Sequence, residues 1–425
     1  MIEFLTGFES TYIPHAGTDV LALTRHLDLW RDDLRLVKAS GVRALRYPAP
    51  WHRLERKRGT FEWGWMDEVM GELHELGLEP IVDLVHHTSF PDWLSGGFAS
   101  QDLPSAEAEL AASFAERFPW VRRYTVFNEP MLTSFMCGHQ GVWPPYGLDA
   151  TTFVSMLRNV CKAICLTTDV LTRTLPEVEL VHIDTCEGHK ALDTESEPFV
   201  EFINHRRFVV HDLVLGRVDS SHPLQPYLVK HGFTREALEW LAEHPARIDV
   251  LGLDYYCHSE YQFHKHGPVT PSREPEGFAS LARQYMDRYQ LPVMLAETNL
   301  RGYSSDRLSW CKYMVEQCER LVDEGADFRG FCWFPFVDST DWDTLLREAN
   351  GHVDPQGIYW LDPDRTTRHS SVFSKWFGRL ASGTASGRDL PAYRFLPPVD
   401  EQLRGFLPQM EAWEWADPPA HPQAE

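Results

Sequence analysis

Two glutamates, each placed at the end of a short apolar run, are the residues best suited to chemistry in this sequence. Glu129 follows the run 124–128 and precedes Pro130, and Glu297 ends the run 292–297. If both runs are strands of a parallel barrel, their ends lie at the rim where loops converge. Two carboxyl groups facing each other there could act on a glycosidic bond. A structural ion pair explains a single glutamate of this kind equally well, but the pair favours chemistry.

The chemistry of a glycosidic bond needs both carboxyl groups. The glycosidic oxygen is a poor leaving group at neutral pH, so one carboxylic acid must protonate it. The oxocarbenium-like transition state needs negative charge on the opposite side, and a carboxylate there can close to a covalent bond. A carboxyl separation of about 5–5.5 Å would indicate retention of configuration, and one of ~6.5–9.5 Å would indicate inversion.

The elements that position these glutamates form a series of short apolar runs that alternate with helical patterns. Runs such as 81–85 lack clean polar alternation, which is typical of strands buried on both faces. Eight alternations predict an α/β fold, a (β/α)₈ TIM barrel with long βα loops, in which strands four and seven carry the two glutamates on opposite sides of the mouth. The predicted strands are residues 4–8, 42–47, 80–86, 124–128, 179–184, 249–255, 292–297 and 328–333.

The 425 residues exceed the roughly 250 that a minimal barrel needs. We expect a catalytic barrel over residues 1–380 and a C-terminal extension over residues 381–425. Residues 382–387 read as a linker, and the Pro- and aromatic-rich sequence after them suggests a tail that docks on the barrel.

Composition narrows the function classes. The chain has 40 Lys+Arg and 62 Asp+Glu, a formal net charge of −22, which argues against nucleic-acid and membrane partners. No apolar segment approaches the ~20 residues of a membrane span, and the N-terminus does not resemble a signal peptide. Eight scattered cysteines without a CxxC pair indicate reduced thiols and a cytoplasmic location. Cys161 and Cys165 lie one helical turn apart and could bind a metal ion together, but packing in the helix core is the favoured interpretation.

The motifs around the two glutamates resemble glycoside hydrolase family 1, the β-glucosidase-like group of retaining barrel glycosidases. The resemblance runs in order from residue 4 to about 377, and it is clearest in Asn128-Glu129-Pro130 and Glu297-Thr298-Asn299. It implies a retaining β-glycosidase that hydrolyses a β-linked glycoside or oligosaccharide through a glycosyl-enzyme intermediate, without a cofactor or metal. The other segments that carry it are residues 45–54, 77–87, 90–94, 252–256 and 331–342.

The resemblance assigns catalytic roles to five residues. Glu129 would be the general acid/base and Glu297 the nucleophile. Arg46 and Tyr256 would keep Glu297 ionised and oriented, since a neighbouring cation and a hydrogen bond both favour the charged form. Asn128 would donate to the 2-hydroxyl of the sugar. Alternatively, Arg46 could form an ion pair that is only structural, and Tyr256 could be an ordinary core residue.

Other positions would contact the carbohydrate substrate, and several depart from the family pattern. The usual glutamine after the first strand is absent, and Glu9 or His15 could replace it or be structural. We therefore doubt that plain glucose is the preferred glycone. Residues 131–147 would form the leaving-group wall or an ordinary cover loop. The predicted substrate contacts are His86, His87, Asp254, Trp333, Asp341 and Trp342, with Trp333 as readily a core residue.

Three alternatives compete with hydrolysis. A metal-dependent hydrolase needs converging histidine ligands, and neither His86-His87 nor His264-Lys265-His266 forms a convincing set. A catalytically silent sugar-binding barrel would show no turnover of an activated aryl glycoside. A transglycosylase would share the glycosyl-enzyme intermediate, so sequence does not separate it from a hydrolase. The oligomeric state is not indicated by the sequence.

Overall fold

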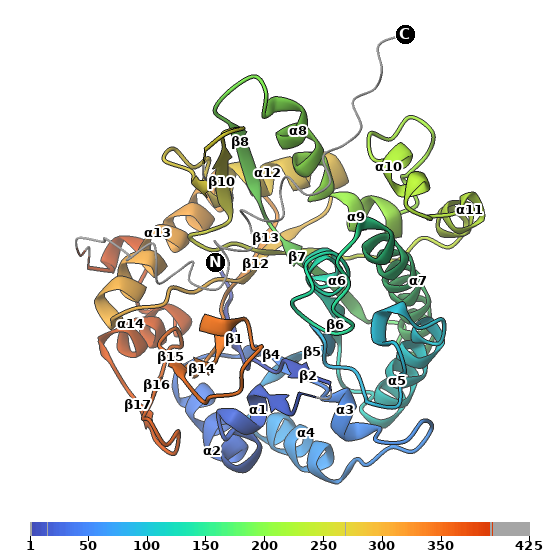
Figure 1. The fold of residues 1–425 in the computed structure, drawn as a ribbon. Helices are drawn as coiled ribbons and strands as arrows, with labels where there is room; N and C mark the ends of the chain where they lie inside the picture. Colours follow the sequence, from blue (N-terminus) through green and yellow to red (C-terminus); the bar gives the residue numbers. More distant parts are fainter. Residues whose placement is uncertain (1, 15, 268, 392, 394–425) are drawn as a thin grey trace.

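The computed structural model describes residues 2–14, 16–267, 269–391 and 393. Eight parallel strands in this part of the chain close into a barrel, which Figure 1 shows with helices around it. The predicted (β/α)₈ fold is confirmed. The barrel strands are β1 (Phe4–Gly7), β4 (Ala44–Pro48), β5 (Glu79–His86), β6 (Arg123–Asn128), β7 (Glu179–Thr185), β9 (Val250–Asp254), β12 (Val293–Glu297) and β13 (Phe328–Trp333).

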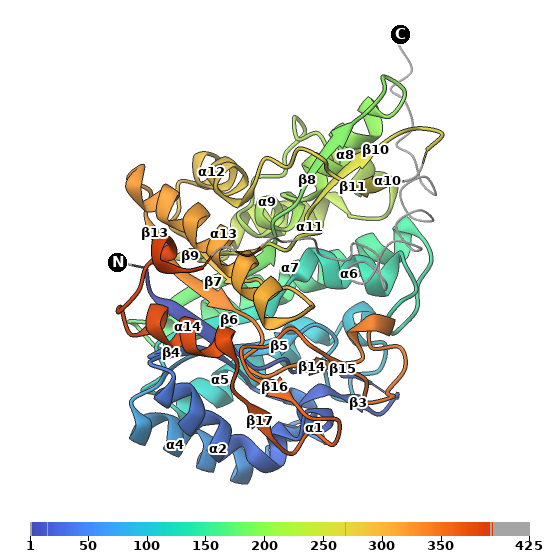
Figure 2. The same ribbon diagram turned by 90° about the vertical axis from the view of Figure 1, so that its left-hand side faces the viewer.

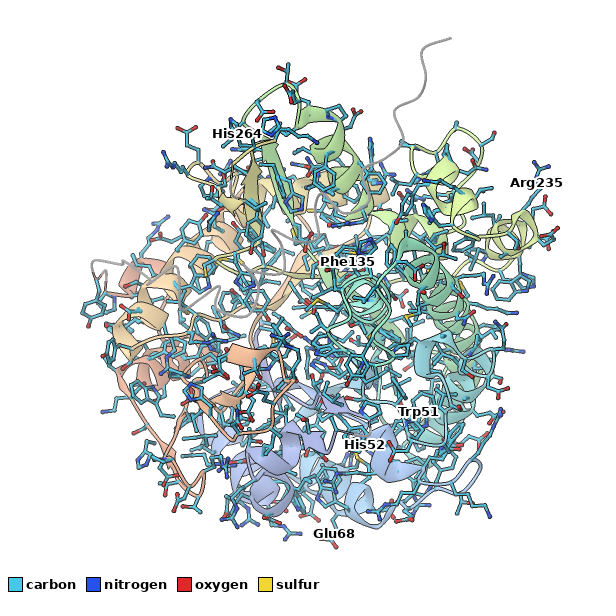
Figure 3. All side chains as sticks on the ribbon, in the orientation of Figure 1. Trp51, His52, Glu68, Phe135, Arg235 and His264 are labelled. Atoms are coloured by element: carbon cyan, nitrogen blue, oxygen red, sulfur yellow. The ribbon has the colours of Figure 1, made fainter. Side chains whose placement is uncertain are left out.

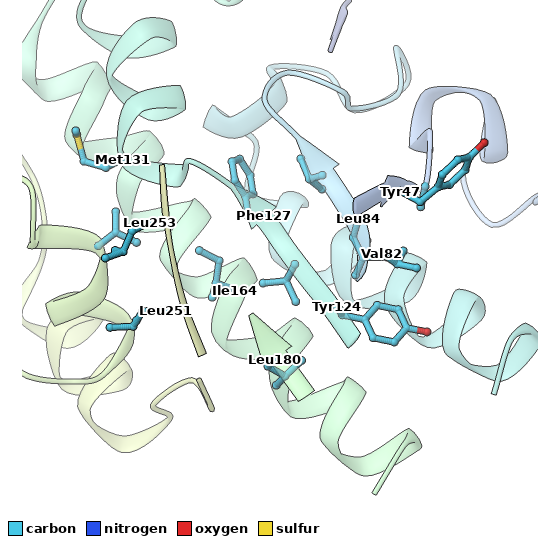
Figure 4. Packing of buried hydrophobic residues seen from close by; sticks show 14 of the residues in the cluster. Tyr47, Val82, Leu84, Tyr124, Phe127, Met131, Ile164, Leu180, Leu251 and Leu253 are labelled. Carbon is cyan, nitrogen blue, oxygen red and sulfur yellow. The ribbon is translucent and has the colours of Figure 1, made fainter. Parts of the chain in front are cut away.

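The barrel strands are almost wholly buried because each has one face toward the barrel interior and the other toward the helices. The interior is filled by side chains such as Leu5, Ile81 and Met294. The outer faces pack against the helices, as Figure 4 shows for Leu180 and Ile164. This double burial explains why the strands read as continuous apolar runs in the sequence.

The surrounding helices follow the apolar spacing of the sequence, and their ends often carry a glycine. Gly77, with φ +60°, caps α4 at its C-terminus in the left-handed conformation that glycine adopts freely. The principal outer helices are α2 (His26–Ala39), α4 (Gly64–Leu76), α5 (Leu103–Arg117), α7 (Ala150–Thr174), α9 (Val209–Val214), α11 (Arg235–Glu243), α12 (Phe278–Tyr289), α13 (Ser304–Asp323) and α14 (Val372–Ala381). Shorter helices are α1 (Val20–Leu23), α3 (Trp51–Leu54) and α10 (Gln225–Lys230).

Further elements are inserted after the barrel strands, and Figure 2 shows α6, α8, β8, β10 and β11 gathered toward the same end of the molecule. The helices there are α6 (Pro130–Gly138) and α8 (Glu197–Arg206). A small sheet is formed by β8 (Gly188–Ala191), β10 (Glu260–Phe263) and β11 (Thr270–Pro271). Two-stranded pairs are β2 (Tyr12–Ile13) with β3 (Thr18–Asp19), β14 (Ser339–Thr340) with β15 (Val353–Asp354), and β16 (Trp360–Leu361) with β17 (Arg368–His369).

The segment that follows α14 contacts α13. Lys312 Nζ donates to the carbonyl of Gly387 over 2.8 Å, and the Gly387 N–H donates to Glu319 Oε1 over 2.9 Å. The side chain of Leu390 is buried. The rest of the expected tail, residues 394–425, lies outside the described residues.

None of the described helices combines the length and the apolarity needed to cross a membrane. The eight cysteines all lie in the described part of the chain and are free thiols. Cys161 and Cys165 are buried in α7, as expected for core packing.

Candidate active site

Glu129 and Glu297 meet in a cavity at the barrel mouth, and Asp254 lies beside them. Carboxylate oxygens of the three residues lie within 4.8 Å of one another. Their side chains are buried, with 5%, 4% and 1% of the Glu129, Glu297 and Asp254 surfaces exposed. The two glutamates that end separate apolar runs in the sequence therefore face each other in space.

The chain turns sharply at Glu129, between β6 and α6. Its backbone has φ +47°, a left-handed conformation that is uncommon for a residue other than glycine. Pro130 occupies the first turn of α6, where its missing N–H costs nothing, and the N–H of Glu129 donates to the carbonyl of Ile183 over 3.1 Å. Burial, with the nearby charges of Glu297 and Asp184, raises the pKa of Glu129 well above its usual range. This carboxyl group is suited to hold a proton at neutral pH.

Glu297 lies at the end of β12 and receives two strong hydrogen bonds. Arg46 Nη1 donates to Oε1 over 2.5 Å, and the Tyr256 hydroxyl donates to Oε2 over 2.6 Å. Each oxygen thus has a separate donor, which fixes the orientation of the group. The structure brings Arg46 and Tyr256 into contact with Glu297, as the resemblance implied.

Arg46 connects several groups beneath the cavity. Its Nη2 donates to Asp83 Oδ2 and to Asn128 Oδ1, each over 2.7 Å. Burial opposes its charge, but the carboxylates of Asp83 and Glu297 outweigh burial and raise the pKa of Arg46 well above its usual value. Asn128 uses its oxygen for Arg46, while its Nδ2 has no hydrogen-bond partner among the described residues.

Replacing Arg46 with alanine should destabilise the protein by about 3–5 kcal/mol, because it leaves the buried carboxylates of Glu297 and Asp83 without their cation. Urea unfolding at neutral pH would measure the change. The control is Arg31→Ala, which removes an exposed cation from Glu68 and Glu72 and should shift the unfolding free energy by less than about 1 kcal/mol. Equal stability of the two variants would contradict the central role of Arg46.

Asp254 ends β9 and adds a third carboxyl group to the cavity. Neither of its oxygens has a hydrogen-bond partner among the described residues. Burial and the charges of Glu297 and Glu129 raise the pKa of Asp254 well above its usual range, although Arg46 acts in the opposite direction. A protonated Asp254 avoids the repulsion of three neighbouring carboxylates and can donate a hydrogen bond into the cavity.

The substitution Asp254→Asn should therefore preserve the shape of the site and flatten the pH dependence of stability. An aspartate with a raised folded-state pKa stabilises the fold fully below its unfolded pKa, about 3.9, and loses that contribution as pH rises toward the folded value. Between about pH 4 and pH 8 the variant should lose less unfolding free energy than the native protein, as urea titrations at each pH would show. Parallel pH profiles for the two proteins would indicate that Asp254 is ionised in the fold.

His86 and His87 occupy different environments although they are adjacent. His86 Nε2 lies 3.4 Å from Glu9 Oε1, and its Nδ1 lies 3.4 Å from Asp83 Oδ2. Burial disfavours the charge on His86, but Glu9 and Asp83 outweigh it and raise the pKa to about 10. Burial and the charge of His86 lower the pKa of His87 to about 3. His87 lines the cavity, with its Nε2 3.6 Å from Glu129 Oε2, whereas His86 lies behind Glu9 as a buried cation.

Glu9, for which the sequence allows either a sugar-binding or a structural role, lines the cavity. Its Oε1 accepts hydrogen bonds from the backbone N–H and the hydroxyl of Thr11 over 2.9 and 2.6 Å. Burial disfavours its charge, but His86 outweighs burial and the pKa of Glu9 falls to about 2. It is therefore an ionised acceptor that faces the cavity. His15, the other candidate for this role, lies outside the described residues.

Trp342 lines the cavity, but Trp333 and Asp341, like His86, do not. Trp333 is fully buried, donates to the carbonyl of Gln356 over 2.9 Å and packs 4.4 Å from the ring of Phe373. The Trp333 side chain points outward from the barrel and is a core residue, which was the second of the two roles expected for it. Asp341 is also fully buried and accepts the backbone N–H groups of residues 350–352. Its carboxylate thus supplies the acceptors for three backbone N–H groups of this loop, which would otherwise lack hydrogen-bond partners.

The predicted leaving-group wall begins as a helix. Residues 130–138 form α6, and Figure 3 labels Phe135 on it, near the centre of the view along the barrel. Four apolar side chains of this helix line the cavity: Met131, Leu132, Phe135 and Met136. Trp143 follows on the loop after the helix, and its Nε1 donates to the carbonyl of Leu345 over 2.8 Å. This side of the cavity is thus mostly apolar.

Several cavity residues were not anticipated from the sequence, among them Glu187, Arg206, His258, Arg301 and Gln356. They lie on βα loops and inserted elements, where no apolar run marks the site. Only Arg301 could have been suspected from the sequence, because it lies four residues after Glu297 on the segment that leaves β12. Arg301 Nε lies 3.2 Å from Asp354 Oδ1.

Comparisons with known proteins extend over most of the barrel. A family model for glycoside hydrolase family 42, described as beta-galactosidase, matches residues 23–131. "Beta-glucosidase A" of Thermotoga maritima is 22% identical over 392 residues, which cover 84% of this chain and 86% of that protein. An "Aryl-phospho-beta-D-glucosidase" of Bacillus subtilis is 21% identical and covers 82% of this chain and 83% of its own.

Solved structures show the same fold. A structure titled "Beta-glucosidase from Thermotoga maritima in complex with azafagomine" superposes with a TM-score of 0.76 at 18% identity, over 85% of this chain and 88% of the other. The two sequence relatives named above are a β-glucosidase and an aryl-phospho-β-glucosidase, in line with the resemblance to family 1, whereas the matching family model is that of family 42 and ends just after Glu129.

Proposed function

We propose that the protein is a glycoside hydrolase, and specifically a retaining β-glycosidase in which Glu297 is the nucleophile and Glu129 the general acid/base. The proposal rests on the two buried carboxyl groups at the barrel mouth, one oxygen of each lying within 4.8 Å of one oxygen of the other. Retaining enzymes hold their two carboxyl groups closer together than inverting enzymes, which need room for a water molecule, and the closeness of these oxygens supports retention. The β-glucosidases among the sequence relatives support the same class of reaction.

In the first step, a Glu297 oxygen attacks the anomeric carbon while the bond to the leaving oxygen breaks. Glu129 gives its proton to that oxygen, so the aglycone departs as a neutral alcohol. Arg46 and Tyr256 donate hydrogen bonds that orient Glu297 before substrate arrives, which reduces the reorganisation needed in the transition state. The raised pKa of Glu129, caused first by burial, keeps the acid protonated for this step.

In the second step, the ionised Glu129 takes a proton from water, and the oxygen of that water attacks the anomeric carbon. The bond to Glu297 breaks, and both carboxyl groups return to their starting protonation states. Two inversions at the same carbon give net retention. An alcohol or a second sugar in place of water would give transglycosylation.

The sugar would lie between the polar floor of the cavity and Trp342. Glu9 and Gln356 line the cavity and can accept and donate hydrogen bonds to its hydroxyl groups. The Nδ2 of Asn128, which has no partner among the described residues, is the donor we assign to the 2-hydroxyl. Because Glu9 is held ionised, the preferred glycone should have hydroxyl groups directed toward a carboxylate, and plain glucose is not implied. The eight free thiols agree with work in the cytoplasm.

A panel of aryl α- and β-glycosides tests this function, with the first-formed product anomer followed by ¹H NMR. We expect turnover of at least one aryl β-glycoside, with the β-anomer formed first. No turnover across the β series would favour a silent sugar-binding barrel, and an α-anomer as the first product would contradict retention.

A further inference from the structure

A second cluster of buried polar side chains lies on the outside of the barrel, away from the cavity. His182 and Asp184 alternate on β7 and therefore point to the same side of the strand, and His211 reaches them from α9. One ligand atom from each of the three residues lies within 4.8 Å of the other two. The side chains are buried, with 3%, 1% and 0% of the His182, Asp184 and His211 surfaces exposed.

The two histidines have an unusual deficit of hydrogen bonds. Neither ring nitrogen of His182, nor either of His211, has a hydrogen-bond partner among the described residues. The rings instead meet edge to face, with centroids 4.8 Å apart. Buried polar atoms in folded proteins are nearly always satisfied, because an unpaired one loses its hydration without compensation. Four such nitrogens in one place indicate that something other than the protein occupies their lone pairs or N–H groups.

We propose that His182, Asp184 and His211 bind a divalent transition-metal ion, zinc being the ion their donor set fits best. Two imidazole nitrogens and one carboxylate oxygen are typical ligands of this ion, with bonds of about 2.0–2.2 Å. A tetrahedral arrangement needs ligand atoms about 3.4 Å apart, so each would move inward by less than about 1 Å from the arrangement described. Rotation of buried imidazole rings and of the carboxylate is enough for such a movement.

The carboxyl group of the cluster is already oriented by the backbone. Asp184 already accepts the backbone N–H groups of Met131 and Thr185 over 3.2 and 3.0 Å. Carboxylates that bind metals are usually held in this way by further hydrogen bonds, and each oxygen retains a lone pair for a cation.

The position of Asp184 connects this cluster to the cavity. Met131, whose N–H it accepts, is two residues after Glu129 at the start of α6. An ion held by Asp184, His182 and His211 would join β7 to α9 and fix the carboxylate that anchors the first turn of α6. The metal is thus expected to stabilise the fold without contact with substrate, and the proposal does not depend on the identity of the reaction.

Metal analysis of the full chain, purified without a histidine tag, tests the site. Elemental analysis by mass spectrometry should find about one zinc ion per chain after incubation with zinc and gel filtration. Removing it with a chelator should lower the melting temperature, and added zinc should restore it. Cobalt added to the metal-free protein should give visible absorption bands of a low-coordinate site, a readout that requires no variant.

The variants His182→Gln and His211→Gln should each reduce the bound metal at least tenfold and abolish the response of the melting temperature to zinc. The control His369→Ala removes an exposed histidine and should leave both unchanged. The proposal is overturned if the native protein holds no zinc, cobalt, iron or manganese after reconstitution. In that case buried water molecules would be the partners of these nitrogens. It is also overturned if both glutamine variants fold and retain the native metal content.

Discussion

Replacing Glu297 with alanine is expected to lower kcat for an aryl β-glycoside by at least about 10⁴-fold, because the variant lacks the only group proposed to form the glycosyl-enzyme bond. Azide should restore part of the activity by entering the space left by the carboxylate. It would attack the anomeric carbon directly, so the glycosyl azide formed should have the α configuration. Product NMR and initial rates with and without azide measure both effects.

The matched control for this substitution is Glu68→Ala. Glu68 lies at the periphery of the molecule in Figure 3 and pairs with Arg31 at the surface, so its loss should leave kcat within twofold of native. Circular dichroism of both variants checks that the Glu297→Ala protein is folded although Arg46 has lost one of its two carboxylate partners. A folded variant with native activity would remove Glu297 from the mechanism.

Replacing Glu129 with alanine is expected to have an effect that depends on the leaving group. With a dinitrophenyl glycoside, whose oxygen needs no proton, the first step should remain fast and give a burst of phenol followed by slow turnover. With a phenyl glycoside, which needs the proton, kcat/KM should fall by about 10²–10⁴-fold. Azide should accelerate turnover of the intermediate and give the β-glycosyl azide, the opposite anomer to that from the Glu297 variant.

The pH profile gives a second test of Glu129. Because burial and neighbouring carboxylates raise the pKa of Glu129, it stays protonated above the usual range of a glutamic acid, and activity should decline only as pH rises through that higher value. In the Glu129→Ala variant this alkaline decline should disappear from the kcat/KM profile of the dinitrophenyl substrate. Persistence of the same decline in the variant would assign it to another group.

The strands were predictable because their signal is local. All eight predicted runs correspond to barrel strands, with ends that differ by up to two residues, as for 42–47 against β4 (Ala44–Pro48). The segment after Glu129 was harder, because its apolar residues are buried all around and show no single helical face. The sequence predicts a loop there, as a leaving-group wall or a cover, and the structure differs in that Pro130 begins a nine-residue helix.

The roles of individual polar residues depended on contacts that the sequence does not encode locally. The resemblance implies a sugar contact for Asp341, but in the structure its carboxylate accepts hydrogen bonds from the N–H groups of residues 350–352. His86 was predicted to contact the glycone and lies instead between Glu9 and Asp83. Nothing in the order of residues indicated that His211 would approach His182, because helix and strand meet only through packing.

The sequence by itself determined the barrel and the placement of Glu129 and Glu297 at strand ends, since apolar runs and their spacing are properties of neighbouring residues. The tertiary structure alone decided how charge is distributed around them. Arg46 contacts Asp83, Asn128 and Glu297 from three other strands, and Asp254 lies against both glutamates. Protonation depends on burial and on charges a few ångströms away, and barrel closure is what brings these groups together.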